Sequence, residues 1–351
     1  VDVIPSEHFN TVLYTGNGAD NHAISGVGFQ PDFVWMKSRS ASRSHALVDS
    51  VRGRGSILFS DGTNAQQAPA AANNDLVSFD TDGFTVGTPE RAGSTNTNND
   101  TIVAWNWKAG GSASSNTNGS ITSSVSANPS AGFSIVSYTG NGVTATTIGH
   151  GLSSAPEMVM VKNRSAASNW AVQSVPLCNS VGNGAFVELN TTGASQAGSN
   201  PRFNSTLPTS SVFSVRGYAN SSTNNNGAAY IAYCFHSVDG YSKVGSYIGN
   251  GNHDGPFVYC GFKPAMVIFK NTTLADDWQI QDTTRSPFNG VNSRLMPNSS
   301  AAEDTNSTWT SVDYLSNGFK QRYSDNIMNA SGKTYIFIAF AENPFKHTNA
   351  R

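Results

Sequence analysis

The string YTGNG at residues 14–18 decides how the rest of the chain is understood, because it occurs three times. It returns unchanged at residues 138–142 and as YIGNG at residues 247–251. Three copies at intervals of about 110 to 125 residues indicate a repeat of domain size. A phosphate-binding loop would lead into a helix, whereas the residues after each copy are short, polar and then strand-like. We therefore interpret the string as a turn.

Other positions keep their register with the tyrosine of each copy. A proline follows the tyrosine after 17 or 18 residues, and a lysine follows each proline six residues later. Each copy closes with an apolar, aromatic run that contains an alanine. The shared positions are Pro31, Pro156 and Pro264, then Lys37, Lys162 and Lys270, then Ala104, Ala232 and Ala339. This register predicts three related units along the chain.

The repeat divides the chain into three predicted domains, each of about one hundred residues. They cover residues 1–112, 132–240 and 241–351. Residues 113–131 are rich in Gly, Ser, Asn and Thr, a composition typical of a linker. No such stretch separates the second and third domains, so we expect a packed junction between those two.

Short strands account for the pattern inside each unit. Runs such as SILFS, GFTVG and TIVAWNW alternate or are rich in β-branched and aromatic residues, and Gly, Asn, Asp or Pro bounds them. The Asn-Gly pairs favour type I′ hairpin turns, and DTDGF at residues 80–84 and SNGF at residues 316–319 have similar chemistry. The predicted fold class is all-β, with three tandem antiparallel β-sandwiches of jelly-roll or lectin-like type.

The composition argues against several classes of partner. Charged residues make up 13% of the chain and the formal net charge is −2. A nucleic-acid partner, which needs clustered Lys and Arg, is therefore not expected. No apolar run reaches the roughly 18 residues of a membrane span, so we expect no membrane insertion.

Cysteines and histidines give no sign of a metal or cofactor site. The three cysteines show no CxxC spacing, and the seven histidines show neither HxH nor HExxH spacing. The odd cysteine count also argues against a disulfide framework. We predict small buried thiols and no bound metal or cofactor.

The polar pattern with the most chemistry is an aspartate followed three residues later by an arginine. It occurs as Asp49 with Arg52 and as Asp282 with Arg285. Carboxylates beside an aromatic ring would suit glycosidic chemistry, but the second unit has Ser174 at the aspartate position. A structural ion pair, which one unit can lose, is the favoured interpretation. Ligand binding and catalysis are the alternatives.

An aromatic ring lies four residues before each of these positions. The rings belong to His45, Trp170 and Trp278. Two interpretations are open for the two tryptophans: core packing between sheets, or an exposed platform on which a sugar stacks. As platform residues, these three are the candidate ligand-binding residues of the chain.

Longer strings resemble a repeated domain of unassigned function in virion proteins of tailed bacteriophages. The strings are GFQPDFVWMKSRS, VAWNWKAGG, GHGLSSAPEMVMVKNRS, DGPFVYCGFKPAMVIFKNTT and the closing AFAENPFK. The resemblance covers about residues 8–346 and is closest in character to tail-fibre and other structural proteins. It implies a virion location with other virion proteins as partners.

The residues and the resemblance together predict a phage virion structural protein, a tail-fibre or surface-decoration component with host-surface adhesion. Phage fibres are usually homotrimers, so we expect a homo-oligomer and favour a trimer. The alternative from a different class is a lectin-like module that binds a host surface glycan, which exposed aromatics beside Asp or Asn would favour. A glycan-degrading enzyme is a remote alternative, and we predict a protein without enzymatic activity.

Overall fold

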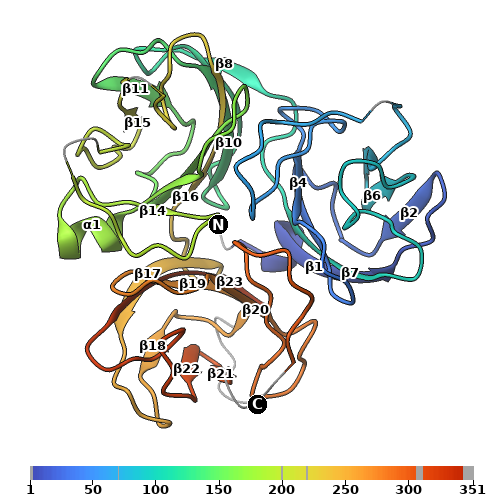
Figure 1. Ribbon diagram of the computed structural model, residues 1–351, viewed down its shortest axis with the longest axis vertical. Helices are drawn as coiled ribbons and strands as arrows, with labels where there is room; N and C mark the ends of the chain where they lie inside the picture. Colours follow the sequence, from blue (N-terminus) through green and yellow to red (C-terminus); the bar gives the residue numbers. More distant parts are fainter. Residues whose placement is uncertain (1–2, 70, 199–200, 219, 306–310, 343–351) are drawn as a thin grey trace.

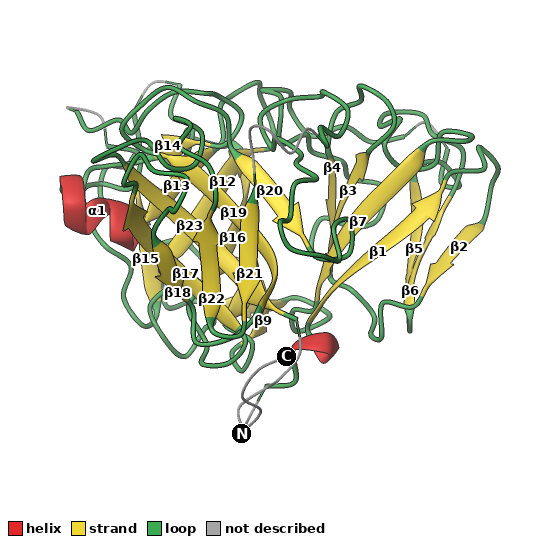
Figure 2. Ribbon diagram, turned by 90° about the horizontal axis from the view of Figure 1, so that it is seen from below, coloured by secondary structure: helices red, strands yellow, loops and turns green. Residues whose placement is uncertain are grey.

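The computed structural model describes residues 3–69, 71–198, 201–218, 220–305 and 311–342. Within these ranges β-strands dominate, and they form antiparallel sheets (Figures 1 and 2). The helical elements in the same ranges are one turn of 3₁₀ helix, η1 (Pro5–Glu7), and the short helix α1 (Val175–Val181). The prediction of an all-β fold is confirmed.

The first part of the chain forms a sandwich of two sheets, which we call the first sandwich. Its inner sheet has the order β1-β7-β3-β4 and its outer sheet the order β2-β6-β5. The strands are β1 (Phe9–Thr15), β2 (His22–Ser25), β3 (Phe33–Ser38), β4 (Ala46–Asp49), β5 (Leu76–Asp80), β6 (Gly83–Val86) and β7 (Thr101–Trp107). Apolar residues of both sheets, among them Val34, Phe84 and Ala104, enclose a core between them.

The last part of the chain repeats this order and forms the third sandwich. Its inner sheet is β17-β23-β19-β20 and its outer sheet is β18-β22-β21. The strands are β17 (Ser242–Ile248), β18 (Phe257–Tyr259), β19 (Pro264–Asn271), β20 (Gln279–Asp282), β21 (Val312–Leu315), β22 (Gly318–Gln321) and β23 (Thr334–Ala341). A core that includes Val267, Phe319 and Phe337 lies between the sheets.

The second sandwich has a larger inner sheet, with the order β14-β13-β12-β16-β10-β9-β8, and a two-stranded outer sheet, β11-β15. The strands are β8 (Ser114–Asn116), β9 (Ser123–Asn128), β10 (Phe133–Thr139), β11 (Thr146–Gly149), β12 (Met158–Asn163), β13 (Ala171–Ser174), β14 (Val187–Glu188), β15 (Val212–Val215) and β16 (Ala229–Phe235). Residues 113–131, predicted as a linker, therefore contribute two strands, and β9 pairs with β10 along five residues. Their small polar side chains suit a partly exposed sheet edge, which by composition resembles a linker.

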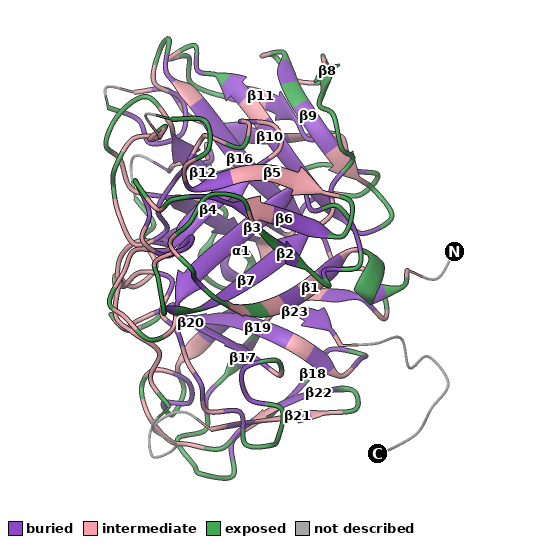
Figure 3. Ribbon diagram, turned by 90° about the vertical axis from the view of Figure 1, so that its right-hand side faces the viewer, coloured by how far each residue is buried: buried purple, intermediate pink, exposed green. Residues whose placement is uncertain are grey.

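The three sandwiches surround a common centre, with the inner sheets towards the centre and the outer sheets at the rim (Figure 1). One apolar cluster takes residues from all three inner sheets, among them Trp105, Tyr233 and Ile338. Buried residues accordingly run along strands of all three sandwiches (Figure 3). Because each inner sheet buries its central face against the other two, no sandwich completes its own hydrophobic burial. The predicted domain boundaries stay a prediction, and residues 343–351 of the third lie outside the described residues.

Strand pairing shows which repeated positions are structurally equivalent. The repeated tyrosines Tyr14, Tyr138 and Tyr247 lie opposite Ile102, Tyr230 and Tyr335. The three repeated lysines lie opposite the next residue along each of these strands, which is Val103, Ile231 or Ile336. The closing alanines agree only in part. Ala104 and Ala232 both lie two residues after the residue opposite the tyrosine, but Phe337 holds that place in the third sandwich. Ala339 is therefore not equivalent to the other two.

The repeated GNG string is a turn, but it is not a type I′ hairpin. Each copy leads from an inner-sheet strand to an outer-sheet strand, and only its second glycine has positive φ: 67° at Gly18, 71° at Gly142 and 67° at Gly251. A type I′ turn needs positive φ at the asparagine as well. A hydrogen bond explains why the string recurs in this form. In each copy the side-chain Oδ1 of a buried asparagine from later in the chain accepts a hydrogen bond from the backbone N–H of the turn asparagine. These contacts are Asn17 to Asn96 at 3.0 Å, Asn141 to Asn224 at 2.9 Å and Asn250 to Asn329 at 2.9 Å.

Candidate functional site

The predicted Asp–Arg pairs are present, and each is buried at a junction between two sandwiches. At the end of β4, Arg52 Nε lies 2.5 Å from Asp49 Oδ2, and neither side chain has exposed surface. The hydroxyl of Tyr233, from the second sandwich, donates to the same carboxylate oxygen at 2.8 Å. Asp49 therefore links the turn after its own strand to the neighbouring sandwich.

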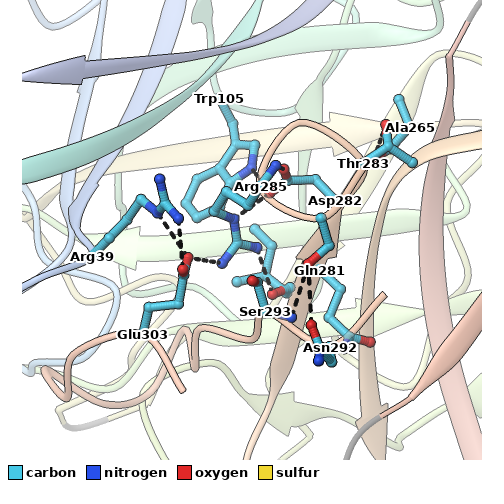
Figure 4. Close-up of polar contacts among 12 residues, drawn as sticks. Arg39, Trp105, Ala265, Gln281, Asp282, Thr283, Arg285, Asn292, Ser293 and Glu303 are labelled. Atoms are coloured by element: carbon cyan, nitrogen blue, oxygen red, sulfur yellow. Dashed lines mark hydrogen bonds and ion pairs between the residues drawn. The ribbon is translucent and has the colours of Figure 1, made fainter. Parts of the chain in front are cut away.

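The second pair makes a larger network between the third and first sandwiches (Figure 4). Arg285 Nε lies 2.6 Å from Asp282 Oδ2, and the indole N–H of Trp105 donates to the same oxygen at 3.0 Å. Arg285 also contacts Glu303 at 2.9 Å, and Glu303 contacts Arg39 of the first sandwich at 2.8 Å. Two arginines and two carboxylates thus balance one another inside this junction.

The third junction, between the second and third sandwiches, is apolar at the equivalent positions. Ser174 and Leu177 replace the aspartate and the arginine, and Leu177 lies on α1, which contacts β17 of the third sandwich. By strand register, Ile338 takes the place of Tyr233 and Trp105. The charged pair and its hydrogen-bonding partner across the junction are therefore absent together.

Burial and pairing fix the charge state of these groups. Burial alone would lower the pKa of Arg52 and of Arg285, but attraction by Asp49 and by Asp282, with the hydrogen bonds, outweighs it, so both pKa values are raised. Burial likewise acts to raise the pKa of Glu303, but the hydrogen bonds and attraction from Arg39 and Arg285 leave that pKa lowered. Arg52, Arg285 and Glu303 therefore stay ionised near neutral pH, which suits fixed ion pairs and not proton transfer.

His45, Trp170 and Trp278 are core residues, and their side chains are buried. Each ring contacts a backbone carbonyl of a different sandwich: Trp170 Nε1 donates to Phe59 O at 2.8 Å, Trp278 Nε1 donates to Glu188 O at 3.0 Å, and His45 Nε2 lies 3.0 Å from Met296 O. A sugar could not stack on rings with no open face. Their predicted role in ligand binding is corrected to a structural one, and core packing is the interpretation that their burial supports.

The protonation of His45 follows from its two neighbours. Trp35 Nε1 can only donate, and it lies 2.9 Å from His45 Nδ1, so Nδ1 is the acceptor. The ring proton is therefore on Nε2, which donates a hydrogen bond to Met296 O. Burial, with repulsion from Lys37, lowers the pKa of His45 well below its ordinary value. The ring is therefore neutral and acts in the same way as the two indoles.

The repeated lysines lie in the same junction region. Lys162 Nζ donates to Thr63 O of the first sandwich at 2.8 Å, and Lys270 Nζ donates to Thr192 O of the second at 3.2 Å. Lys37 Nζ donates to Ser38 O at 2.6 Å. Burial lowers the pKa of each of the three amines to about 8. All three are held by carbonyl oxygens.

Internal space offers no room for a ligand at the centre. The cavity there has a volume of about 10 Å³ and is lined by apolar and aromatic side chains, including Trp107 and Phe340. A cavity of that size is at the lower limit for one water molecule. An open groove of about 350 Å³ lies beside β8, β9 and β10, and its lining is rich in hydroxyl groups, such as those of Ser115 and Ser124.

Exposed aromatic residues occur on the outer sheet of the third sandwich, where sequence reasoning did not place them. Phe257 and Tyr259 of β18 are 44% and 65% exposed, while Val258 between them points into the core. The residues opposite them, Lys320 and Gly318, share their face of the sheet. We call the solvent side of β18-β22-β21 the aromatic face. A comparison of the three copies of the repeat could have revealed this face, since only the third copy has aromatic residues at both outward-facing positions of this strand.

Other classes of site find no support in the described part of the chain. No group of three or more His, Cys, Asp or Glu side chains that could hold a metal ion occurs among the described residues. The three cysteines are buried and unpaired with one another. None of the helices within the described ranges is long and apolar enough to cross a membrane.

The chain belongs to the family called domain of unknown function DUF7483, whose model matches residues 4–344. The match passes through all three sandwiches as one domain, in agreement with their common central core. A comparison with curated proteins gives no match.

Proposed function

We propose that the protein is a non-enzymatic structural module with an adhesive surface. The observation that carries the proposal is that the buried carboxylates are held in ion pairs and hydrogen bonds inside the protein. Asp49 and Asp282, the carboxylates with the most chemical promise in the sequence, have no exposed side-chain surface and are held by an arginine and a neighbouring sandwich. A catalytic carboxylate must reach its substrate, and these two cannot do so without opening the core.

The setting of this function is proposed from the sequence resemblance alone. It is a phage virion, with a tail fibre or surface decoration as the location and other virion proteins as partners. A chain of low net charge, closed around a central core, suits a part that must stay rigid and not attract nucleic acid. A homotrimer stays our prediction for assembly, and sedimentation equilibrium at tens of micromolar protein would show it as three times the chain mass.

Incubation of the chain with purified bacterial surface polysaccharides tests the non-enzymatic function. We expect labelled protein to bind at least one polysaccharide and to release no reducing sugar. Release of reducing sugar that Asp282→Asn or Asp49→Asn abolishes would overturn the proposal. Failure to bind any polysaccharide or cell surface would leave a purely architectural role.

A further inference from the structure

We propose that the aromatic face of the third sandwich binds a neutral saccharide chain. The inference rests on the adhesive function proposed above and deepens it, because it names the residues and the class of ligand. It is carried by the exposure of Phe257 and Tyr259, the way their rings lie, and the balance of charges beside them.

Both rings fold back over glycine and keep one side open to solvent. An added Cβ on Gly318 would come within 3.1 Å of Phe257 Cε2, so the phenyl ring leans over this glycine. An added Cβ on Gly261 would lie 3.5 Å from the hydroxyl oxygen of Tyr259. The two residues are separated by one residue on the strand, which places their backbones about 7 Å apart. Two neighbouring flat apolar surfaces result.

The charged side chains beside the rings neutralise one another. Lys320 Nζ lies 3.0 Å from Asp254 Oδ1, and Arg322 lies 3.1 Å from the same oxygen and 2.5 Å from Asp313 Oδ2. Among the described residues, these two bases and two acids leave no net charge at this place. The patch therefore lacks the excess charge that a polyanion or polycation would need, but it offers many donors and acceptors to a ligand rich in hydroxyl groups.

The equivalent faces of the other sandwiches show that the fold does not require these aromatics. By strand register, Ala23 and Ser25 hold the two places in the first sandwich, and Thr147 and Gly149 hold them in the second. In the second sandwich a preceding segment lies alongside β11: Ser120 bonds with Thr147, and Ile121 forms a parallel bridge with Ile148.

In the third sandwich β18 is an edge strand, and within the described residues no strand pairs with its other side. In the second sandwich the side-chain amide of Asn116 lies over Gly149, since an added Cβ there would lie 1.9 Å from its Oδ1, whereas Tyr259 holds the equivalent place in the third sandwich. The third face therefore keeps its aromatic rings open. A pyranose ring has one apolar side that can lie on an aromatic ring while its hydroxyl groups bond to flanking polar groups. A neutral saccharide chain satisfies both parts of the surface.

Binding of neutral oligosaccharides to the whole chain tests the proposal. The probes are gluco-, galacto-, manno- and xylo-oligosaccharides of six units, with hyaluronate as the charged comparison, measured by NMR line broadening or calorimetry at millimolar ligand. We expect at least one neutral probe to bind with little dependence on salt. Phe257→Ala with Tyr259→Ala should weaken binding at least tenfold. The matched control Ile248→Ala, which removes another exposed apolar side chain of the third sandwich, should not.

The outcomes separate the proposal from the general function. If polysaccharide adhesion persists unchanged in a folded double variant, the aromatic face is not the site although adhesion stands. If no neutral probe binds, or only hyaluronate binds and salt abolishes it, the proposal is overturned. Self-association that the double variant abolishes, without any saccharide binding, would assign the face to a second copy of the chain and would also overturn it. Thermal unfolding of the variant confirms that it is folded.

Discussion

Two of the three junctions in this molecule are built around buried ion pairs, whereas the third is apolar. Asp49–Arg52 and Asp282–Arg285 each bond to a side chain of the neighbouring sandwich, while Leu177 and Ile338 occupy corresponding places in the third junction. The three junctions otherwise share the ring contacts made by His45, Trp170 and Trp278. The charged and the apolar junctions therefore differ in the Asp–Arg pair and its polar partners, and not in the ring contacts.

The comparison teaches that the charged pairs are one of two ways to fill the same space. Buried ion pairs often contribute little more than a well-packed apolar replacement, but removal of one partner leaves an uncompensated charge and is costly. In the apolar junction both charged residues and their hydrogen-bonding partner are replaced together. This joint replacement is what we expect of a structural element. For a catalytic group, we would not expect replacement to coincide with the replacement of a packing contact.

Arg285→Leu should have the largest effect, because it leaves Asp282 and Glu303 without their shared base. We expect a loss of about 3–5 kcal/mol in the free energy of unfolding, measured by urea denaturation. Arg91→Leu is the control, since Arg91 pairs with Glu90 at a partly exposed site and should cost less than about 1 kcal/mol. Equal costs for the two variants would contradict the importance of the buried network.

Leu177→Ala tests the apolar junction. It should cost about 2–5 kcal/mol through lost burial and the cavity left in the central core. Val181→Ala, on the same helix but exposed, should change the free energy of unfolding by about 0.5 kcal/mol or less. A small cost for Leu177→Ala would mean that α1 is not part of the junction.

Lys162 should give a smaller, pH-dependent effect. Its pKa is lowered in the folded chain to about 8 from the ordinary value of 10.5, so the unfolded state binds more protons between these values. Stability contributed by this group therefore rises as pH increases through 8, by on the order of 1 kcal/mol between pH 7 and pH 9.

The measurement for Lys162 is a difference between two proteins. The free energy of unfolding of the native chain minus that of Lys162→Met should grow over this pH range. The subtraction cancels the buried tyrosines and cysteines, whose raised pKa values act in the opposite direction at higher pH. A difference that is flat or falls with pH would show that the amine keeps its ordinary pKa.

Much of the fold could be predicted from the sequence because it depends on local patterns. Strand content followed from alternation, and the GNG string was understood as a turn because it recurs. The type of turn was not predictable, because the asparagine that holds each turn, such as Asn96, lies some 80 residues away in the chain and nothing local marks it. Residues 113–131 were predicted to be a linker because a solvent-exposed sheet edge and a linker have similar amino-acid compositions.

The site was predicted less well than the fold. The sequence identified Asp49, Arg52, Asp282 and Arg285 as structural pairs, but not their partners across the junctions, which come from other parts of the chain. Core packing and a binding role both stayed open for Trp170 and Trp278, because a tryptophan at a strand start suits either side of a sheet. Phe257 and Tyr259 were passed over, since alternation alone does not say which side faces solvent.

Transfer of the apolar junction onto the charged one tests the central claim most directly. Arg52→Leu alone should lose about 3–5 kcal/mol of unfolding free energy, since Asp49 stays buried without its base. Adding Asp49→Ser and Tyr233→Phe removes the orphaned carboxylate and its donor, and copies Ser174 and Leu177 at this place. We predict that the triple variant regains at least about half of the loss, a coupling that urea denaturation resolves. A triple variant less stable than Arg52→Leu alone would contradict the claim that the pair and the apolar contact are interchangeable parts of one structural junction.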